Sequence, residues 1–199
     1  MSSHFYLERR DGVAVLHLSS EDGTNRLTRD CVLTLTGALE ELARDPKPLI
    51  LAGNQKFFSV GADLREISAL SGADAYAFAR IGQNLMHTVA RFPAPVYAAI
   101  EGHCMGGGLD LVLACHFRIA TPSAVFGHRG AALGLMTGWG GTQRLPRLIG
   151  KAKALELFVE AEKIKALEAL RMGLVDVVAD DPVDEAMRLI QNVGSPRRH

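Results

Sequence analysis

The stretch Ile100-Glu101-Gly102-His103-Cys104-Met105-Gly106-Gly107-Gly108-Leu109-Asp110 decides the fold of this chain. An apolar, extended segment (95–100) precedes the glycines, and an apolar helix-like run (109–115) follows them. Glycines let a ligand approach the backbone closely, and the first N–H groups of a helix have no internal partner. The helix field also favours a negative charge at Asp110. The stretch thus offers N–H donors beside a carboxylate; the alternative interpretation is a tightly packed strand–turn–helix joint.

A second glycine and acidic residue, Gly61 and Asp63, precede another helical run over 64–70. This layout predicts that the N–H of Ala62 lies unpaired at a helix start. The alternative is an ordinary capped helix with Asp63 in its first turn.

The length of 199 residues indicates one domain, or one domain with a small appendage, that has a core of its own, and a content of 48% apolar and 22% charged residues is typical of a soluble globular protein. Net charge is zero, from 22 basic and 22 acidic residues, which argues against partners such as nucleic acid or membrane surfaces. Three cysteines, Cys31, Cys104 and Cys115, lack metal-ligand spacing, so we expect reduced thiols in the cytoplasm and no metal site. We find no signal-peptide pattern, membrane-length apolar run or phosphate-binding loop.

Strand and helix patterns alternate along the chain, which predicts an α/β fold with a mostly parallel sheet. A hairpin at 4–8 and 13–19 turns at Asp11-Gly12, and Thr28 or Asp30 caps the first helix. Further strands are expected at 48–52, 95–100, 116–120, 124–126 and 175–178. Further helices are expected at 64–70, 73–91, 109–115, 142–148, 151–160, 166–172 and 183–191, before a frayed tail at 195–199. Residues 127–141 read as an irregular, glycine-rich loop.

Five ordered segments together resemble the crotonase (enoyl-CoA hydratase/isomerase) superfamily. They are Asn25-Arg26-Leu27-Thr28, residues 57–64, residues 92–108, Trp139-Gly140-Gly141-Thr142-Gln143-Arg144-Leu145-Pro146 and Gly173-Leu174-Val175-Asp176. The resemblance implies a ClpP-like spiral of ββα units, with an acyl-CoA-binding core over 1–182 and a shortened C-terminal helical trimerisation segment over 183–199. It also implies a homotrimer or hexamer.

The resemblance further implies an enzyme of fatty acid metabolism that acts on acyl-CoA thioesters and stabilises a thioester enolate. Coenzyme A enters as part of the substrate, and no separate cofactor is implied. By motif, the oxyanion-hole N–H groups belong to Ala62 and Gly107. The residues implied to line the coenzyme A side are Ala62, Asp63, Leu64, Arg65 and Gly107.

The acid–base positions depart from the pattern of the resemblance. Family hydratases use two glutamates, and this chain carries Asp110 at one position and Gly130 at the other. Because a positioned proton-transfer group contributes roughly 10²–10⁴-fold, the missing partner matters. His103, His128 and Arg129 are the candidates to compensate. Three hypotheses stay open. The first is a hydratase or isomerase, and the second is a decarboxylase or thioester hydrolase in which Arg129 or His128 binds a group of the substrate. The third is a non-catalytic acyl-CoA-binding scaffold.

Overall fold

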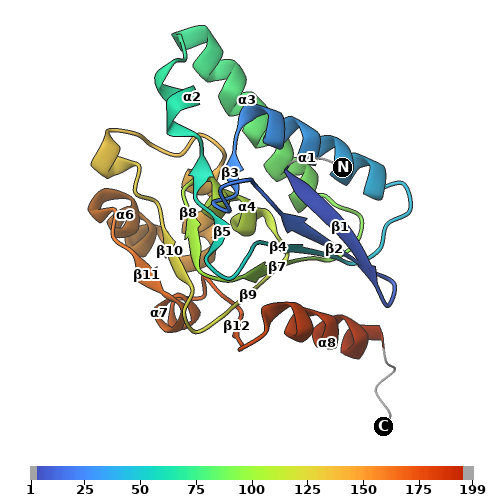
Figure 1. Cartoon of the computed structure of the whole chain (residues 1–199). Helices are drawn as coiled ribbons and strands as arrows, with labels where there is room; N and C mark the ends of the chain where they lie inside the picture. The colour runs from blue at the N-terminus through green and yellow to red at the C-terminus, as the bar shows by residue number, and fades with distance from the viewer. Residues whose placement is uncertain (1–3, 195–199) are drawn as a thin grey trace.

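The computed structural model describes residues 4–194, which form three sheets and their covering helices (Figure 1). The strands are β1 (Phe5–Arg10), β2 (Val13–Leu18), β3 (Arg26–Leu27), β4 (Leu49–Ala52), β5 (Phe57–Ser59), β6 (Gly61–Ala62), β7 (Val96–Ile100), β8 (His103–Met105), β9 (Phe117–Ala120), β10 (Val125–Gly127), β11 (Ile164–Lys165) and β12 (Val177–Val178). The helices are α1 (Arg29–Leu42), α2 (Leu64–Ser68), α3 (Gly72–Ala90), α4 (Gly107–Ala114), the 3-10 turn η1 (Ala131–Leu133), α5 (Gly141–Ile149), α6 (Lys151–Glu160), α7 (Ala166–Arg171) and α8 (Pro182–Gly194).

The largest sheet has six strands in the order β1-β2-β4-β7-β9-β12. Only the β1–β2 hairpin is antiparallel, and the other neighbours pair in parallel. A four-stranded sheet, β11-β10-β8-β5, lies beside it, and β3 and β6 form a two-stranded sheet. The mostly parallel sheet expected from the sequence is therefore confirmed.

The chain repeats a strand–strand–helix unit. Each unit places its first strand in the six-stranded sheet and its second in the four-stranded sheet before a helix follows, as in β4–β5–α2, β7–β8–α4 and β9–β10–α5. This arrangement is the spiral of ββα units that the resemblance implies. Within the four-stranded sheet, β8 pairs in parallel with both β5 and β10, so the carboxyl ends of the second strands meet at one edge.

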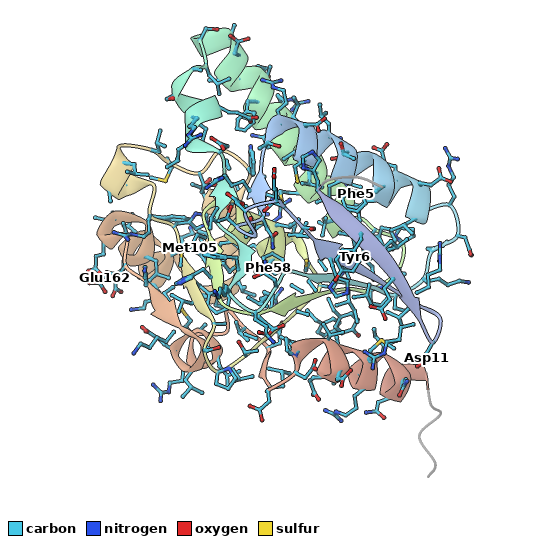
Figure 2. The ribbon with its side chains drawn as sticks, in the orientation of Figure 1. Phe5, Tyr6, Asp11, Phe58, Met105 and Glu162 are labelled. Carbon is cyan, nitrogen blue, oxygen red and sulfur yellow. The ribbon has the colours of Figure 1, made fainter. Side chains whose placement is uncertain are left out.

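Helices cover both faces of the six-stranded sheet (Figure 1). On one face, α1, α3 and α4 enclose a large core that includes Leu16, Leu51 and Phe58; Figure 2 shows Phe58 inside the molecule and Asp11 at its edge. On the other face, Ala186 and Met187 of α8 pack against a second, smaller core on the sheet. Burial of these faces holds the strand ends in fixed positions.

Several local predictions are confirmed. Asp11 and Gly12 both have positive φ, 51° and 80°, as a tight hairpin turn requires. Thr28, rather than Asp30, caps α1, because its side chain accepts a hydrogen bond from the Cys31 N–H. Of the expected C-terminal segment, residues 195–199 lie outside the described residues.

Three predictions about the glycine stretches are wrong in detail. The central helix begins at Gly107 rather than Leu109, and Gly106 is its N-cap residue. His103–Met105, for which the sequence predicted no strand, forms β8. Ala62 ends the short strand β6 instead of starting a helix; Asp63 is the N-cap, and α2 begins at Leu64. A three-residue strand between glycines leaves no alternation long enough to detect in a sequence.

Candidate active site

A cavity of about 410 Å³ opens between α2, α3, the start of α4 and the loop after β10. Its walls are mostly apolar: Val60, Leu64, Ile67, Leu70, Phe78, Leu133, Leu135, Met136, Trp139 and Phe158. Four polar or charged side chains also line it, and they are Asp110, His128, Arg129 and Thr137. An apolar cavity with a few convergent polar groups is the usual form of a small-molecule site.

The three glycines at the start of α4 meet three different demands. Gly106 has φ 51° and ψ −118°, a conformation that L side chains rarely adopt. A Cβ on Gly107 would lie 2.5 Å from the Trp139 ring, and one on Gly108 would lie 2.7 Å from the Ser59 carbonyl oxygen. The helix start is therefore packed closely on both sides, and it also forms part of the cavity wall.

The backbone of β6 crosses the start of α4 at close range. A Cβ on Gly61 would lie 2.7 Å from the Gly107 nitrogen, and a Cβ on Gly107 would lie 3.3 Å from the Ala62 nitrogen. Ala62 and Gly107 both line the cavity. The two amide groups that the sequence resemblance singles out are thus neighbours in the wall of the cavity.

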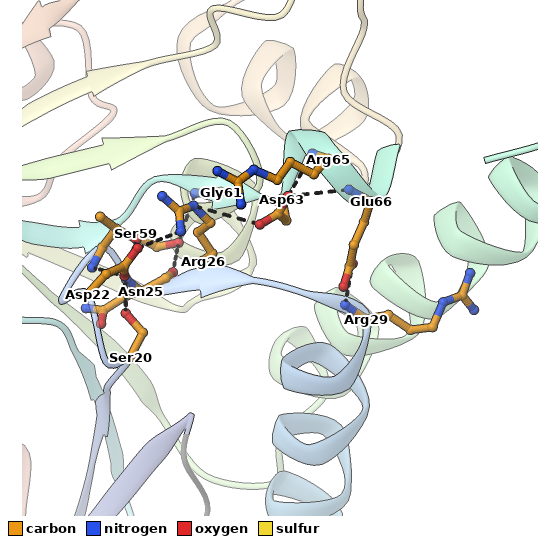
Figure 3. Close-up of polar contacts among 11 residues, drawn as sticks. Ser20, Asp22, Asn25, Arg26, Arg29, Ser59, Gly61, Asp63, Arg65 and Glu66 are labelled. Carbon is orange, nitrogen blue, oxygen red and sulfur yellow. Dashed lines mark hydrogen bonds and ion pairs between the residues drawn. The ribbon is translucent and has the colours of Figure 1, made fainter. Parts of the chain in front are cut away.

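A buried polar network fixes the segment that carries Ala62 (Figure 3). The Asn25 amide donates to the carbonyl oxygens of Phe57 and Phe58 at 3.0 and 3.1 Å. The Ser59 hydroxyl donates to the Asn25 carbonyl at 2.7 Å and accepts from the Gly61 N–H at 3.0 Å. These bonds tie β5 and β6 to the segment before α1, which restricts movement of the Ala62 backbone.

Asp110 is the single charged residue of α4, and only 1% of it is exposed. Its N–H donates to the Gly106 carbonyl at 3.0 Å, within the first turn of the helix. Every residue from Gly108 to Ala114 is buried, so the surroundings of the carboxylate are apolar on the helix itself. Burying an ionised carboxylate is costly unless other groups compensate it.

His128 and Thr137 face the Asp110 carboxylate. His128 Nε2 lies 3.2 Å from Oδ1, and the Thr137 hydroxyl donates to Oδ2. His128 directly follows β10, while α4 follows β8, and these strands pair in parallel with Gly127 opposite Met105. The register of two adjacent strand ends therefore brings His128 and Asp110 together.

The His128–Asp110 contact is close, but neither facing atom completes a hydrogen bond of good geometry. Nε2 and Oδ1 are both buried without a hydrogen-bond partner among the described residues. The His128 ring packs at a tilt against Phe158, with centroids 5.3 Å apart. We treat the pair as an electrostatic contact whose polar atoms keep unused hydrogen-bonding capacity.

Gly141 and Arg144 bring α5 close to the same carboxylate. A Cβ on Gly141 would lie 2.2 Å from Asp110 Oδ1 and 2.9 Å from His128 Nε2. Burial lowers the pKa of the Arg144 guanidinium, and the negative charge of Asp110 acts in the opposite direction. Burial likewise raises the pKa of the Cys104 thiol, an effect to which Cys115 and Asp110 add.

The structure brings together most of the residues predicted for the site. Ala62, Leu64, Gly107, Asp110, His128, Arg129 and Gly130 all line the cavity. Asp63 instead caps α2 through the Arg65 N–H, at 2.7 Å, and Arg65 itself is exposed. His103 lies on β8 against Phe57, with ring centroids 5.6 Å apart, and does not line the cavity. Roles for Asp63 and Arg65 on the coenzyme A side stay predictions.

Sequence reasoning missed Thr137 and the close approach of Gly141. Thr137 lies within the loop that carried no regular pattern, so nothing in the sequence indicated which way its side chain points. Gly141 belongs to the segment 139–146 that resembles the family, but its close approach to Asp110 depends on how α5 packs against α4. Among residues 4–194, no cluster of three or more His, Cys, Asp or Glu side chains is placed to hold a metal ion.

Comparisons with known proteins agree with this geometry. The model of the enoyl-CoA hydratase/isomerase family matches residues 8–197. A probable enoyl-CoA hydratase of Bacillus subtilis is 42% identical over 175 residues, which are 86% of this chain and 67% of that protein. A crotonyl-CoA hydratase of Syntrophomonas wolfei is 39% identical over the same shares. The crystal structure of an enoyl-CoA hydratase from Bacillus anthracis superposes with a TM-score of 0.91 at 33% identity, covering 97% of this chain and 77% of that one.

The spiral of ββα units and the family match define a crotonase-fold protein. This chain belongs to the enoyl-CoA hydratase/isomerase family of enzymes. In the part of the chain that the structure describes, no helix combines the length and apolarity needed to cross a bilayer. The homotrimer or hexamer and the cytoplasmic location stay predictions.

Proposed function

We propose that this protein acts on an acyl-CoA thioester and adds water to the double bond of an enoyl-CoA through a thioester enolate. The observation that carries the proposal is the buried Asp110 carboxylate, which shares one cavity with the backbone of Ala62 and Gly107. The curated relatives named as hydratases support the same reaction class.

In this proposal, the N–H groups of Ala62 and Gly107 bind the thioester oxygen. Negative charge grows on that oxygen as the enolate forms, and each donor of such a hole contributes roughly 2.7–4 kcal/mol where it has been measured. The close packing of Gly61 against the Gly107 nitrogen supports a fixed spacing of the two amides. Fixed donors need no reorganisation during the reaction.

Asp110 moves the proton in this proposal. It replaces one of the usual glutamates and is one methylene shorter, but it lies in the cavity wall and keeps a hydroxyl and an imidazole beside it. Gly130 also lines the cavity and carries no titratable group. The second proton-transfer role must therefore fall to another residue, or the reaction must proceed without it.

The cavity favours an uncharged acyl group over a malonyl-type one. Its walls are predominantly aliphatic and aromatic, and Arg129, which is an exposed residue, is the one Lys or Arg among the lining residues. Decarboxylation of a malonyl-type acyl group would fit better with a cation buried beside its carboxylate. A non-catalytic scaffold stays the third hypothesis.

The test is hydration of crotonyl-CoA, measured as loss of the absorbance of the conjugated thioester. We expect wild-type protein to turn over and Asp110→Asn to lose roughly 10²–10⁴-fold in kcat, the usual size of an acid–base contribution. Glu101→Gln is the matched control, because Glu101 is a half-buried carboxylate outside the cavity. Binding of crotonyl-CoA without turnover would contradict the proposal, and turnover of malonyl-CoA would then support decarboxylation.

A further inference from the structure

We infer that His128 is the second acid–base group of this site and works with Asp110 as one proton-holding pair. The inference rests on the proposed function and deepens it. It assigns to His128 the role that the resemblance gives to a glutamate at the Gly130 position, two residues further along the loop.

The unused hydrogen-bonding capacity of the pair is the first argument. Nε2 of His128 and Oδ1 of Asp110 are 3.2 Å apart and buried, yet neither has a hydrogen-bond partner among the described residues. Leaving a buried polar group unsatisfied costs roughly 1–3 kcal/mol. Packing alone does not explain a histidine here, because an apolar side chain could cover Phe158 without that cost.

The position of the ring is the second argument. His128 is only 6% exposed, and it lines the cavity together with Asp110 and Gly130. An imidazole can accept a proton at one nitrogen while it holds one at the other, and histidine changes charge near neutrality. A proton taken from a molecule in the cavity can therefore be held by the ring while Asp110 balances the charge.

The other candidates do not fit this role. Arg129 is exposed, and a guanidinium group offers only hydrogen-bond donors and no site to accept a proton. His103 lies outside the cavity. A side chain at Gly130 itself would meet the Leu135 carbonyl oxygen, 2.6 Å from its Cβ, so this loop conformation leaves no room for the missing glutamate.

The chemistry balances with water and the enoyl thioester alone. A new C–O bond forms between water and Cβ, and water gives one proton to the His128–Asp110 pair. The π electrons of the double bond move toward the thioester, so that the enolate oxygen is bound by the two backbone N–H groups. The Cα of the enolate then accepts a proton from the His128–Asp110 pair. This step reforms the thioester carbonyl and returns the pair to its starting state.

The experiment is a double-mutant cycle on crotonyl-CoA hydration with Asp110→Asn, His128→Gln and the double variant. We expect His128→Gln to lower kcat about 100-fold with KM nearly unchanged. Residues that act as one unit give grossly non-additive losses, so the double variant should be no slower than the slower single variant. His103→Gln, which changes a histidine outside the cavity, should stay within about threefold of wild type.

Chemical rescue separates a proton-transfer role from a packing role. His128→Ala leaves space where the ring stood, and added imidazole should restore part of the lost kcat, whereas a purely structural defect would not respond. Thermal unfolding of each variant shows whether it folds. If His128→Ala does not fold, the loss of kcat in His128→Gln and the double-mutant cycle test the inference without the rescue.

The outcomes distinguish this inference from the proposed function. An active wild type together with a fully active His128→Gln, or with losses that simply multiply in the double variant, overturns the inference and leaves the proposed function standing. A wild type that neither hydrates crotonyl-CoA nor exchanges the α-protons of butyryl-CoA with D2O overturns both.

Discussion

Gly141 offers a sharp test of the site, because its missing side chain makes room for the Asp110 carboxylate. An added Cβ would lie 2.2 Å from Oδ1 of Asp110 and 2.9 Å from Nε2 of His128. Carbon–oxygen contacts in proteins are usually about 3.3–3.6 Å. In Gly141→Ala, the carboxylate must therefore move by about 1 Å, or α5 must shift away from α4 by a similar distance.

A displacement of that size is expected to damage catalysis more than folding. Misplacing a reacting group by about 1 Å can cost roughly 100-fold in rate, while overpacking a core position typically costs about 1–3 kcal/mol of stability. We expect Gly141→Ala to stay folded and to lose about 100-fold in kcat for crotonyl-CoA. The assay is steady-state hydration, with circular dichroism and urea unfolding on the same preparation.

Gly138→Ala is the matched control for this prediction. Gly138 lies three residues earlier, in the loop before α5, and lines the cavity, but its added Cβ would make only an ordinary contact, 3.6 Å from the Ala79 Cβ. We expect it to keep kcat within a few-fold of wild type. Equal activity of Gly141→Ala and wild type, with unchanged stability, would show that the position of the carboxylate does not limit the reaction and would refute the reasoning.

Three further predictions follow from glycine packing and from the buried thiols. Gly130→Glu should lower stability without raising hydratase activity, because its Cβ would lie 2.6 Å from the Leu135 carbonyl oxygen. Urea unfolding and the hydration assay check this prediction, and a gain in kcat would contradict it. Gly82→Ala should cost about 1–3 kcal/mol in urea unfolding, because its Cβ would lie 2.1 Å from the Trp139 ring nitrogen, whereas Gly37→Ala, with open space around it, should not destabilise. Burial raises the pKa of Cys31 and Cys115 to about 12, above the value of about 8.5 for an exposed thiol, so the unfolded chain loses these protons first. The contribution of these two thiols to the free energy of unfolding is therefore fully present below about pH 8.5 and is lost as the pH rises toward 12. Replacing both residues by alanine should flatten this pH dependence in urea unfolding.

Much of the fold could be predicted because local signals were strong. Asp11-Gly12 fixes the first hairpin through its positive φ angles, and Thr28 caps α1 with its hydroxyl. The order of strands and helices followed from apolar runs and breakers. The short strands β8 and β11, with three and two residues, were out of reach, since their pairing rather than their composition defines them.

The site was only partly predictable, because its decisive contacts join segments that only tertiary structure brings together. Asp110 and Gly107 stood out within one stretch, but the partner of Asp110 depends on β10 lying beside β8 in parallel register. The sequence offered three candidates to compensate for Gly130, and only the structure separates His128, at the carboxylate, from His103, outside the cavity. Thr137 had no sequence signal, since loop direction decides where its hydroxyl points.

The energetics of the His128–Asp110 pair bear on whether the protein is an enzyme or a scaffold. Replacing both partners of a buried polar contact by apolar groups of the same shape can be nearly neutral or stabilising. The core around α4 is apolar and closely packed, so the fold has no need of a carboxylate and an imidazole at 1% and 6% exposure. A protein that only held an acyl-CoA could bind the acyl chain in an apolar cavity without them. Their presence next to the Ala62 and Gly107 amides, with hydrogen-bonding capacity left over, is what proton transfer requires, and it favours the enzyme.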